Sequence, residues 1–230
     1  MQDAGHIAFD GVSVVREGRT VLRDITLSLT ARSIAVVGAN GSGKSSFART
    51  LNGLVPISSG ILSVHGLDPS RDGKAVRQRV GMVFSNPAAQ VIMPTVREDL
   101  AFTLRGRKLS RDEISARVDA ALEKVGMAGL ADSSVYSLSG GQQQLVALAA
   151  VLIGEPSLIV ADEPTALLDL GNAKAISRIL LDEFDAQVVL VTHDLDLAKR
   201  CEYALCFADG RLADAGEPAA VVERYRRTYA

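Results

Sequence analysis

The segment Ser33–Gly53, SIAVVGANGSGKSSFARTLNG, constrains the fold more than any other part of the sequence. Its first apolar residues, at 34–37, predict a fully buried strand. The run after Gly43 predicts a helix that ends at Gly53, a residue suited to a left-handed C-cap. The glycines and the lysine between these two elements allow two interpretations, a tight strand-to-helix turn or a loop that cradles a phosphate.

Residues 38–45, GANGSGKS, match the pattern G-x-x-x-x-G-K-[ST]. The glycines leave room for successive backbone N–H groups to point at phosphate oxygens. Lys44 is expected to bring its charge to the β- and γ-phosphates, Ser45 to bind magnesium through its hydroxyl, and the following helix to present its positive end. The candidate nucleotide-binding residues of this loop are Gly38, Ala39, Asn40, Gly41, Ser42, Gly43, Lys44, Ser45 and Ser46.

A second apolar strand, predicted at 158–161, is followed directly by Asp162 and Glu163. An acidic residue at the tip of such a strand can hold magnesium from the side opposite the phosphate loop. The two motifs together favour ATP-type triphosphate binding with Mg²⁺ over an accidental turn.

The rest of the chain alternates between strand-like and helix-like patterns. Strands are predicted at 7–9, 12–15, 20–29, 60–66, 80–84, 187–192 and 204–216, with a helix at 171–184. This order predicts an α/β fold with a mostly parallel sheet that helices cover on both faces. From about residue 85 to 156, the sequence pattern predicts mainly helices. One helix is predicted to begin at Ser110, which has capping-box spacing to Glu113. Its predicted apolar face comprises Ile114, Val118, Ala121, Leu122 and Val125.

Composition narrows the class of protein. The 230 residues carry 25 Lys and Arg against 27 Asp and Glu, and this balance disfavours a nucleic-acid partner. Cys201 and Cys206 lack metal-ligand spacing and are typical of reduced thiols in a cytosolic protein. The N-terminus lacks the features of a signal peptide, and no segment approaches the ~20 apolar residues of a membrane span. We therefore expect any membrane role to require a partner.

The segment SLSGGQQQLVALA, at 137–149, decides between classes of nucleotide-binding protein. Ser139 and Gln142 have capping-box spacing, and the glycine pair between them leaves a helix start that can receive an anion. An ordinary capped helix is the alternative for this segment in isolation. However, this segment lies between the phosphate loop and the acidic strand, and that order of motifs resembles the ATP-binding cassette (ABC) family.

That resemblance covers almost the whole chain and implies a single nucleotide-binding domain over 1–230. It implies a P-loop NTPase (RecA-like) core with an N-terminal antiparallel β subdomain, at 1–84 and 157–230, and an inserted α-helical subdomain at 85–156. It also implies a dimer, because the signature of one subunit binds the γ-phosphate held by the other. The signature residues are Leu138, Ser139, Gly140, Gly141 and Gln142.

The resemblance assigns roles to four further residues. Glu163 would polarise the attacking water and Asp162 would support magnesium. Asp169 would be the D-loop aspartate, and His193 would sense the γ-phosphate, although a lone histidine is more often structural. These assignments describe an ATPase that uses ATP and Mg²⁺.

VFSNPAAQ, at 83–90, is similar to a segment in the ATPases of energy-coupling factor (ECF) importers for vitamins and transition metals. Ser85 stands where the family has a glutamine that reaches the lytic water, so either a water bridges the gap or turnover is slow. Gln90 falls where the family contacts its membrane subunit, with a solvated loop glutamine as the alternative. Arg16 replaces the aromatic residue that stacks on adenine, and a guanidinium can also stack on a ring. Leu145 replaces a common arginine.

These features predict the ATPase subunit of a membrane importer, bound peripherally at the cytoplasmic face of the cell membrane. Its expected partners are a second ABC ATPase, identical or paralogous, a transmembrane coupling subunit and a substrate-binding membrane subunit. Biotin, cobalt and nickel are solutes implied by the resemblance alone. Two alternatives stay open. One is a soluble cassette ATPase that acts on nucleic acid or ribosomes. The other is a low-turnover ATP sensor, which the replacement of the usual glutamine by Ser85 favours.

Overall fold

A computed structural model describes residues 5–228, and their contacts divide the chain into two compact units. The first unit comprises residues 5–82, Ser157–Glu163 and 185–228. The second comprises Val83–Pro156 and Pro164–Phe184. The second unit starts at Val83, and the sequence predicts an inserted helical subdomain at 85–156. This unit also includes Pro164–Phe184, which the sequence placed in the core, because the helix in this segment packs on the signature helix.

The first unit contains a three-stranded antiparallel sheet in the order β2-β1-β4. Its strands are β1 (Ile7–Arg16), β2 (Arg19–Leu29) and β4 (Ser59–Val64). The two short strands predicted at 7–9 and 12–15 form the single strand β1, whose pairing register shifts between Phe9 and Val12. Such a shift bends a strand without ending it, so the polar residues at this point do not separate two strands.

A second sheet of the first unit has the strand order β5-β6-β7-β3-β8-β9. Its strands are β3 (Ser33–Gly38), β5 (Val80–Val83), β6 (Leu158–Asp162), β7 (Gln187–Val191), β8 (Tyr203–Ala208) and β9 (Arg211–Gly216). Strands β6, β7, β3 and β8 run parallel. Every residue of β3, β6 and β7 is buried, as expected for central strands covered on both faces.

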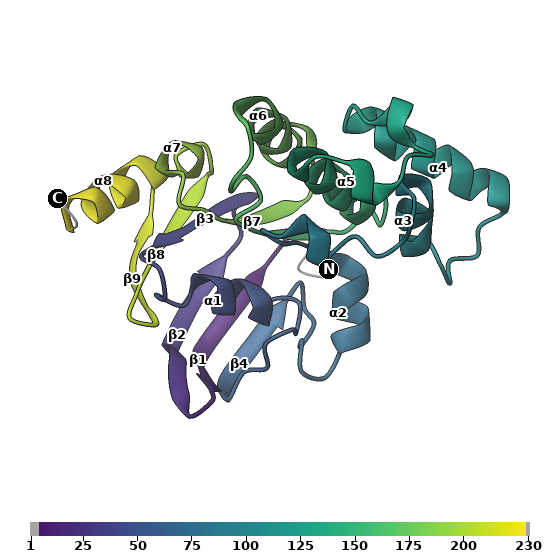
Figure 1. The fold of residues 1–230 in the computed structure, drawn as a ribbon. Helices are drawn as coiled ribbons and strands as arrows, with labels where there is room; N and C mark the ends of the chain where they lie inside the picture. Colours follow the sequence, from purple (N-terminus) through teal and green to yellow (C-terminus); the bar gives the residue numbers. More distant parts are fainter. Residues whose placement is uncertain (1–4, 229–230) are drawn as a thin grey trace. The chain divides into compact units, whose positions relative to one another are not determined.

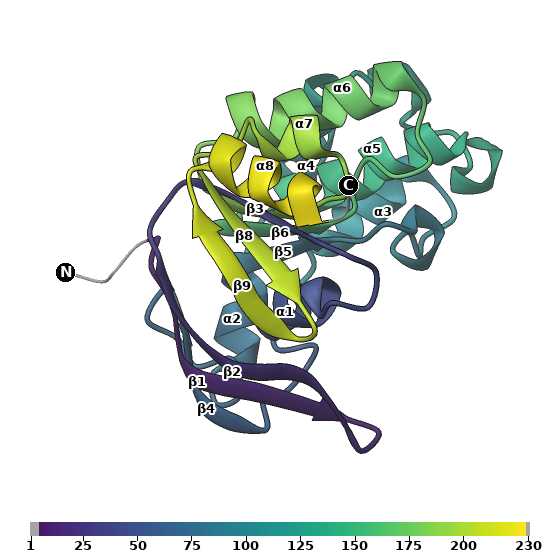
Figure 2. The same ribbon diagram turned by 90° about the vertical axis from the view of Figure 1, so that its left-hand side faces the viewer.

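The run predicted as one strand at 204–216 is instead the antiparallel hairpin of β8 and β9. The chain turns at Asp209 and Gly210, which have φ of 49° and 76°. An Asp-Gly pair is a strong sequence signal for such a turn, because both central residues need positive φ. The hairpin is visible in Figure 2, where β8 and β9 lie beside the C-terminal helix.

The first unit also contains α1 (Lys44–Thr50), α2 (Gly73–Arg79), α7 (Leu195–Ala198) and α8 (Pro218–Thr228). Figure 1 shows α1 between the antiparallel sheet and the parallel strands. Its Phe47 is fully buried, and the ring lies 4.8 Å from that of Phe9 and 5.0 Å from that of Phe207. These ring contacts fix α1 against both sheets. The sequence predicted neither α7 nor α8.

The second unit is helical and has α5 (Gly140–Leu152) at its centre, in contact with α3 (Val96–Thr103), α4 (Arg111–Lys124) and α6 (Leu170–Arg178). It also contains three short 3₁₀ helices, at Pro87–Ala89, Ala128–Leu130 and Val135–Ser137, and a π-helical segment, Ile179–Glu183, directly after α6. The predicted capping box of Ser110 and Glu113 is confirmed at the start of α4, and Val118 and Leu122 face inward. Within residues 5–228, no helix has the length and apolar character that a bilayer crossing requires.

Candidate active site

The phosphate loop follows β3 and has a backbone that only glycine can adopt at two positions. Gly38 has φ of +145°, and a Cβ there would collide with the carbonyl oxygen of Phe207. Gly43 has φ of +104°, and a Cβ there would lie 2.8 Å from the carbonyl oxygen of Val21. The loop therefore passes so close to β2 and β8 that side chains are excluded, as a cradle of backbone amides requires.

A cleft of about 390 Å³ opens at this loop, within the first unit. Helix α1 begins here, and its N-cap is Gly43, which has no side chain to accept from the first amides of the helix. These amides and the helix dipole favour an anion. The cleft is lined by Val21, Asn40, Gly41, Ser42, Gly43, Lys44, Ser45, Ser46, Glu163 and His193.

Lys44 is the cation of the cleft and is only 6% exposed. Its Nζ donates to the carbonyl oxygens of Gly38 at 2.8 Å and Ala39 at 2.9 Å. Burial lowers the pKa of this amine, and the negative charges of Glu163 and Asp162 oppose that effect. The ammonium group thus bonds its own loop, and an incoming phosphate oxygen would compete with these two carbonyls.

The acidic residues lie where the parallel strands end. Asp162 is the last residue of β6 and is 3% exposed. Ser45 Oγ donates to its Oδ1 at 2.9 Å, and Arg49 Nη2 donates to its Oδ2 at 3.2 Å. A hydroxyl and a carboxylate are hard oxygen donors, so Ser45 and Asp162 fit a Mg²⁺ ion.

Glu163 follows β6 with φ of 55°, a left-handed conformation that is uncommon outside glycine. Its N–H donates to the carbonyl of Val191 at 3.0 Å, and its Oε2 accepts from the backbone N–H of His193 at 3.2 Å. Its Oε1 lies 3.2 Å from His193 Nε2. Burial raises the pKa of the Glu163 carboxyl, although the charges of His193 and Lys44 oppose it. A raised pKa suits a group that accepts a proton near neutral pH.

The signature residues lie in the second unit, at the start of α5. Ser139 Oγ accepts from the Gln142 N–H at 3.3 Å, and Gln142 Oε1 accepts from the Ser139 N–H at 2.9 Å. The predicted capping box is therefore present, with Leu138 buried and Gly140 exposed beside it. A Cβ at Gly141 would collide with the side chain of Asn172, so this glycine permits α5 and α6 to pack closely.

Asp169, the predicted D-loop residue, is the N-cap of α6 in the same unit. Its Oδ1 accepts from the Asn172 N–H at 3.0 Å. The pKa of this carboxyl is lowered by its bonds to Asn172. The side chain therefore fixes the start of α6, and Leu167 and Leu170 on either side of it are strongly exposed.

Ser85 and Gln90 lie near the start of the second unit. Ser85 is exposed, whereas Gln90 is half-buried and accepts from the Phe84 N–H through Oε1 at 3.2 Å. Gln144, on α5 and 1% exposed, donates from Nε2 to the Phe84 carbonyl at 2.9 Å. Two glutamines thus bond both backbone groups of the residue that precedes Ser85. The side chain of Gln90 is not a purely solvated one, and Gln144 is a residue that sequence reasoning missed.

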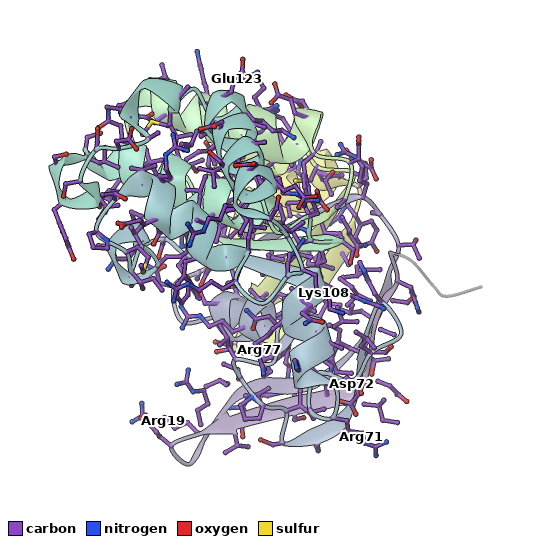
Figure 3. All side chains as sticks on the ribbon, turned by 90° about the vertical axis from the view of Figure 1, so that its right-hand side faces the viewer. Arg19, Arg71, Asp72, Arg77, Lys108 and Glu123 are labelled. Carbon is purple, nitrogen blue, oxygen red and sulfur yellow. The ribbon has the colours of Figure 1, made fainter. Side chains whose placement is uncertain are left out.

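The structure bears differently on Arg16 and Leu145, which replace an aromatic residue and an arginine of the family. Arg16 is exposed at the end of β1, in register with Arg19, which is labelled in Figure 3. The described residues that line the cleft do not include Arg16. Leu145 is 6% exposed on α5, so an apolar side chain fits this position because the helix is buried there. The structure thus accounts for Leu145, and adenine stacking by Arg16 stays a prediction.

Comparisons with known proteins identify the family of the chain. The ABC transporter family model matches residues 22–166. The biotin transport ATP-binding protein BioM of Rhizobium etli is 43% identical over 222 residues, which cover 96% of this chain and 98% of BioM. The energy-coupling factor transporter ATP-binding protein EcfA1 of Levilactobacillus brevis is 41% identical, over 88% of this chain and 75% of EcfA1.

Among solved structures, cbiO1 from Clostridium perfringens, described as part of the ABC transporter complex cbiONQ, superimposes with a TM-score of 0.85. It is 31% identical, and the match covers 97% of this chain and 93% of cbiO1. The family's mixed α/β P-loop NTPase fold, expected from the sequence, is therefore confirmed. On these matches, the chain belongs to the ABC transporter family, whose ATP-binding proteins are ATPases coupled to transport.

Proposed function

We propose that this protein is the ATP-hydrolysing subunit of an ECF-type importer for a vitamin such as biotin or for cobalt or nickel ions. The observation that carries the catalytic part is the Glu163 carboxylate, which has a raised pKa and lines the same cleft as Lys44 and Ser45. The names of the relatives BioM and EcfA1, each more than 40% identical, support the importer class.

Residues of the first unit bind the phosphates, hold Mg²⁺ and activate the attacking water in this proposal. The loop amides and Lys44 bind the phosphates and neutralise their charge. Ser45 and Asp162 would hold Mg²⁺, which supplies further positive charge to the phosphate oxygens. Glu163 orients the attacking water and accepts its proton, and His193, 3.2 Å from Glu163, orients the carboxylate and senses the γ-phosphate.

The second unit completes the site of another subunit in this proposal. The signature residues, at the exposed start of α5, contact the γ-phosphate held by a second copy or a paralogue, with Asp169 at the same interface. ATP thereby holds two subunits together, and hydrolysis releases them. The segment around Gln90 passes this movement to a transmembrane coupling subunit, with a substrate-binding membrane subunit as the third component. The ATPase would then lie at the cytoplasmic face of the membrane and bind no nucleic acid.

The test of the catalytic role compares Glu163→Gln with the exposed control Glu123→Gln. Loss of the proton acceptor should lower ATP hydrolysis by at least about 100-fold, because general-base catalysis contributes about 10²–10⁴-fold. Mg-ATP binding should be retained, and the ATP-bound dimer should live longer. A Glu163→Gln protein that hydrolyses ATP at the parental rate would remove this residue from catalysis.

The importer class is tested by the partners of the full-length protein. Purification from its native membranes should recover hydrophobic membrane subunits, and uptake of labelled biotin, cobalt or nickel by the reconstituted complex should require ATP. Stimulation of hydrolysis by DNA or ribosomes, without membrane partners, would favour the soluble cassette ATPase. Absence of phosphate release from both the isolated protein and the complex would favour the ATP sensor.

A further inference from the structure

Arg49 contacts the carboxylate that is proposed to hold magnesium. It lies on α1 four residues after Ser45, so the two side chains leave the same face of the helix. Ser45 Oγ donates to Asp162 Oδ1 at 2.9 Å, and Arg49 Nη2 donates to Asp162 Oδ2 at 3.2 Å. One helix face thus supplies a donor to each oxygen of the same carboxylate. Arg49 has no part in the proposed binding of ATP or in its hydrolysis.

The burial of Asp162 explains why a cation is needed there. Its side chain is 4% exposed, and a buried ionised carboxylate is costly unless a charge and hydrogen bonds compensate it. Lys44 does not make this contact, since its Nζ donates to the carbonyls of Gly38 and Ala39. The guanidinium of Arg49 therefore compensates the carboxylate when no divalent ion is bound.

Arg49 is also placed so that it can give up this contact. Its side chain is 38% exposed, against 4% for Asp162, and the buried Nε of the guanidinium has no hydrogen-bond partner among residues 5–228, so the 3.2 Å contact of Nη2 holds this group without a second hydrogen bond from Nε. A long arginine side chain can keep its stem packed while its charged end moves into solvent. The contact is consequently one that a stronger cation can displace.

We propose that Arg49 is a placeholder cation, a positioning residue that orients the Asp162 carboxylate in the metal-free site and competes with Mg²⁺ for Oδ2. This inference rests on the proposed function, in which Ser45 and Asp162 hold Mg²⁺ beside ATP. Two ligands that compete for one group weaken each other's binding by the same factor. Removal of the guanidinium should therefore destabilise the metal-free protein and tighten the binding of Mg²⁺.

The experiment uses the purified full chain with three substitutions. Arg49→Met keeps the length and the apolar stem of the side chain but removes the charge, and Arg49→Lys keeps a charge without the planar fork. Arg77→Met, on the exposed surface of α2, is the matched control. Two quantities are measured: Tm in EDTA and in saturating Mg²⁺ with a non-hydrolysable ATP analogue, and the midpoint of a Mg²⁺ titration of analogue binding.

For Arg49→Met, we expect Tm in EDTA to fall by at least about 3 °C. The loss should be smaller with Mg²⁺ and analogue, because the metal then compensates Asp162. The Mg²⁺ midpoint should fall by about 5-fold or more, the lower end of typical coupling between sites. Arg49→Lys should shift the midpoint in the same direction by less, and Arg77→Met should change neither quantity.

Four results would overturn the proposal. An equal loss of Tm with and without Mg²⁺ would make Arg49 a structural residue only, and an unchanged or raised Mg²⁺ midpoint would show that it does not compete with the metal. If Arg49→Met does not fold, an unchanged midpoint for Arg49→Lys is decisive in the same way. Analogue binding by the parental protein that does not respond to Mg²⁺ would instead contradict the proposed function itself, and the placeholder role with it.

Discussion

The starts of α1 and α5 differ in how the first backbone amides of each helix are satisfied. Both are glycine-rich helix N-termini that the sequence predicts to receive phosphate. At α1, the N-cap Gly43 offers no side chain to the first amides of the helix, which therefore stay available to a ligand. At α5, Ser139 and Gln142 form a capping box that satisfies two amides from within the chain.

This contrast indicates a division of labour between the two units. The phosphate loop surrounds its ligand with backbone amides, Lys44 and the acidic end of β6, all in the first unit. The signature helix bonds amides at its start with its own side chains, and Ser139 and Gly140 are exposed there. In the proposed function, these residues contact a phosphate that a second subunit holds. We therefore expect the first unit to determine ATP affinity and the signature to affect hydrolysis.

The largest difference should appear between two glycine substitutions. Gly38→Ala forces a Cβ against the carbonyl of Phe207 at a φ of +145°, so we expect ATP affinity to fall at least about 100-fold and Tm to fall by several degrees. Gly140→Ala meets no heavy atom within 4 Å among the described residues and should leave the affinity of the isolated protein within about 2-fold. Equal losses in a calorimetric titration with Mg-ATP would erase the contrast.

A smaller effect is expected when the cap of α5 is removed. Ser139→Ala should cost about 1 kcal/mol of stability, a shift in Tm of about 2–4 °C. It should also lower the ATPase rate of the assembled complex by about 10-fold or more, because one donor to the developing charge is lost. ATP affinity of the isolated chain should not change. A weakened affinity of the isolated chain would show that the signature already acts within one subunit.

A further loss, of about 3–10-fold in kcat with little change in KM, is expected for Gln90→Leu. The substitution leaves the Phe84 N–H without its acceptor and so loosens the backbone next to Ser85. Ala89→Ser, at an exposed neighbouring position, is the control. The measurement is the rate of the isolated protein, since a residue that only contacts a membrane subunit would leave this rate unchanged.

The smallest expected effect is a pH-dependent gain in stability from Glu163→Gln. The native pKa of Glu163 is raised by burial, so the native state holds its proton more tightly than the unfolded state does. The parental protein therefore loses stability as pH rises from the ordinary glutamate pKa of 4.5 through the raised value. The variant should gain in Tm relative to the parent above that window and converge with it below pH 4.5. A constant difference at all pH values would argue against this origin.

Much of the site could be predicted because its signals are local or follow from strand order. The glycines and Lys44 are contiguous in sequence. Asp162, Glu163 and His193 come together with them because β6, β7 and β3 are parallel neighbours that end at one edge of the sheet.

The missed residues depend on packing between distant segments. Arg49 and Asp162 are 113 positions apart, and only the contact of α1 with β6 pairs them. Spacing of four from Ser45 was the one available signal for Arg49. For Gln144, the signal was a polar residue within an apolar run, which predicts an internal partner without naming Phe84. The sequence pattern predicts one strand at 204–216 and not the β8–β9 hairpin, although the Asp-Gly pair in this run is itself a turn signal.

Calorimetric titration of Mg-ATP into Glu163→Gln protein, alone and combined with Gly38→Ala or Ser139→Ala and kept below the concentration at which ATP-bound dimers form, tests the central claim most directly. The account predicts saturable binding of one nucleotide per chain, abolished by Gly38→Ala and unchanged by Ser139→Ala. Absence of saturable binding by the Glu163→Gln protein, or a loss on Ser139→Ala as large as that on Gly38→Ala, would contradict it.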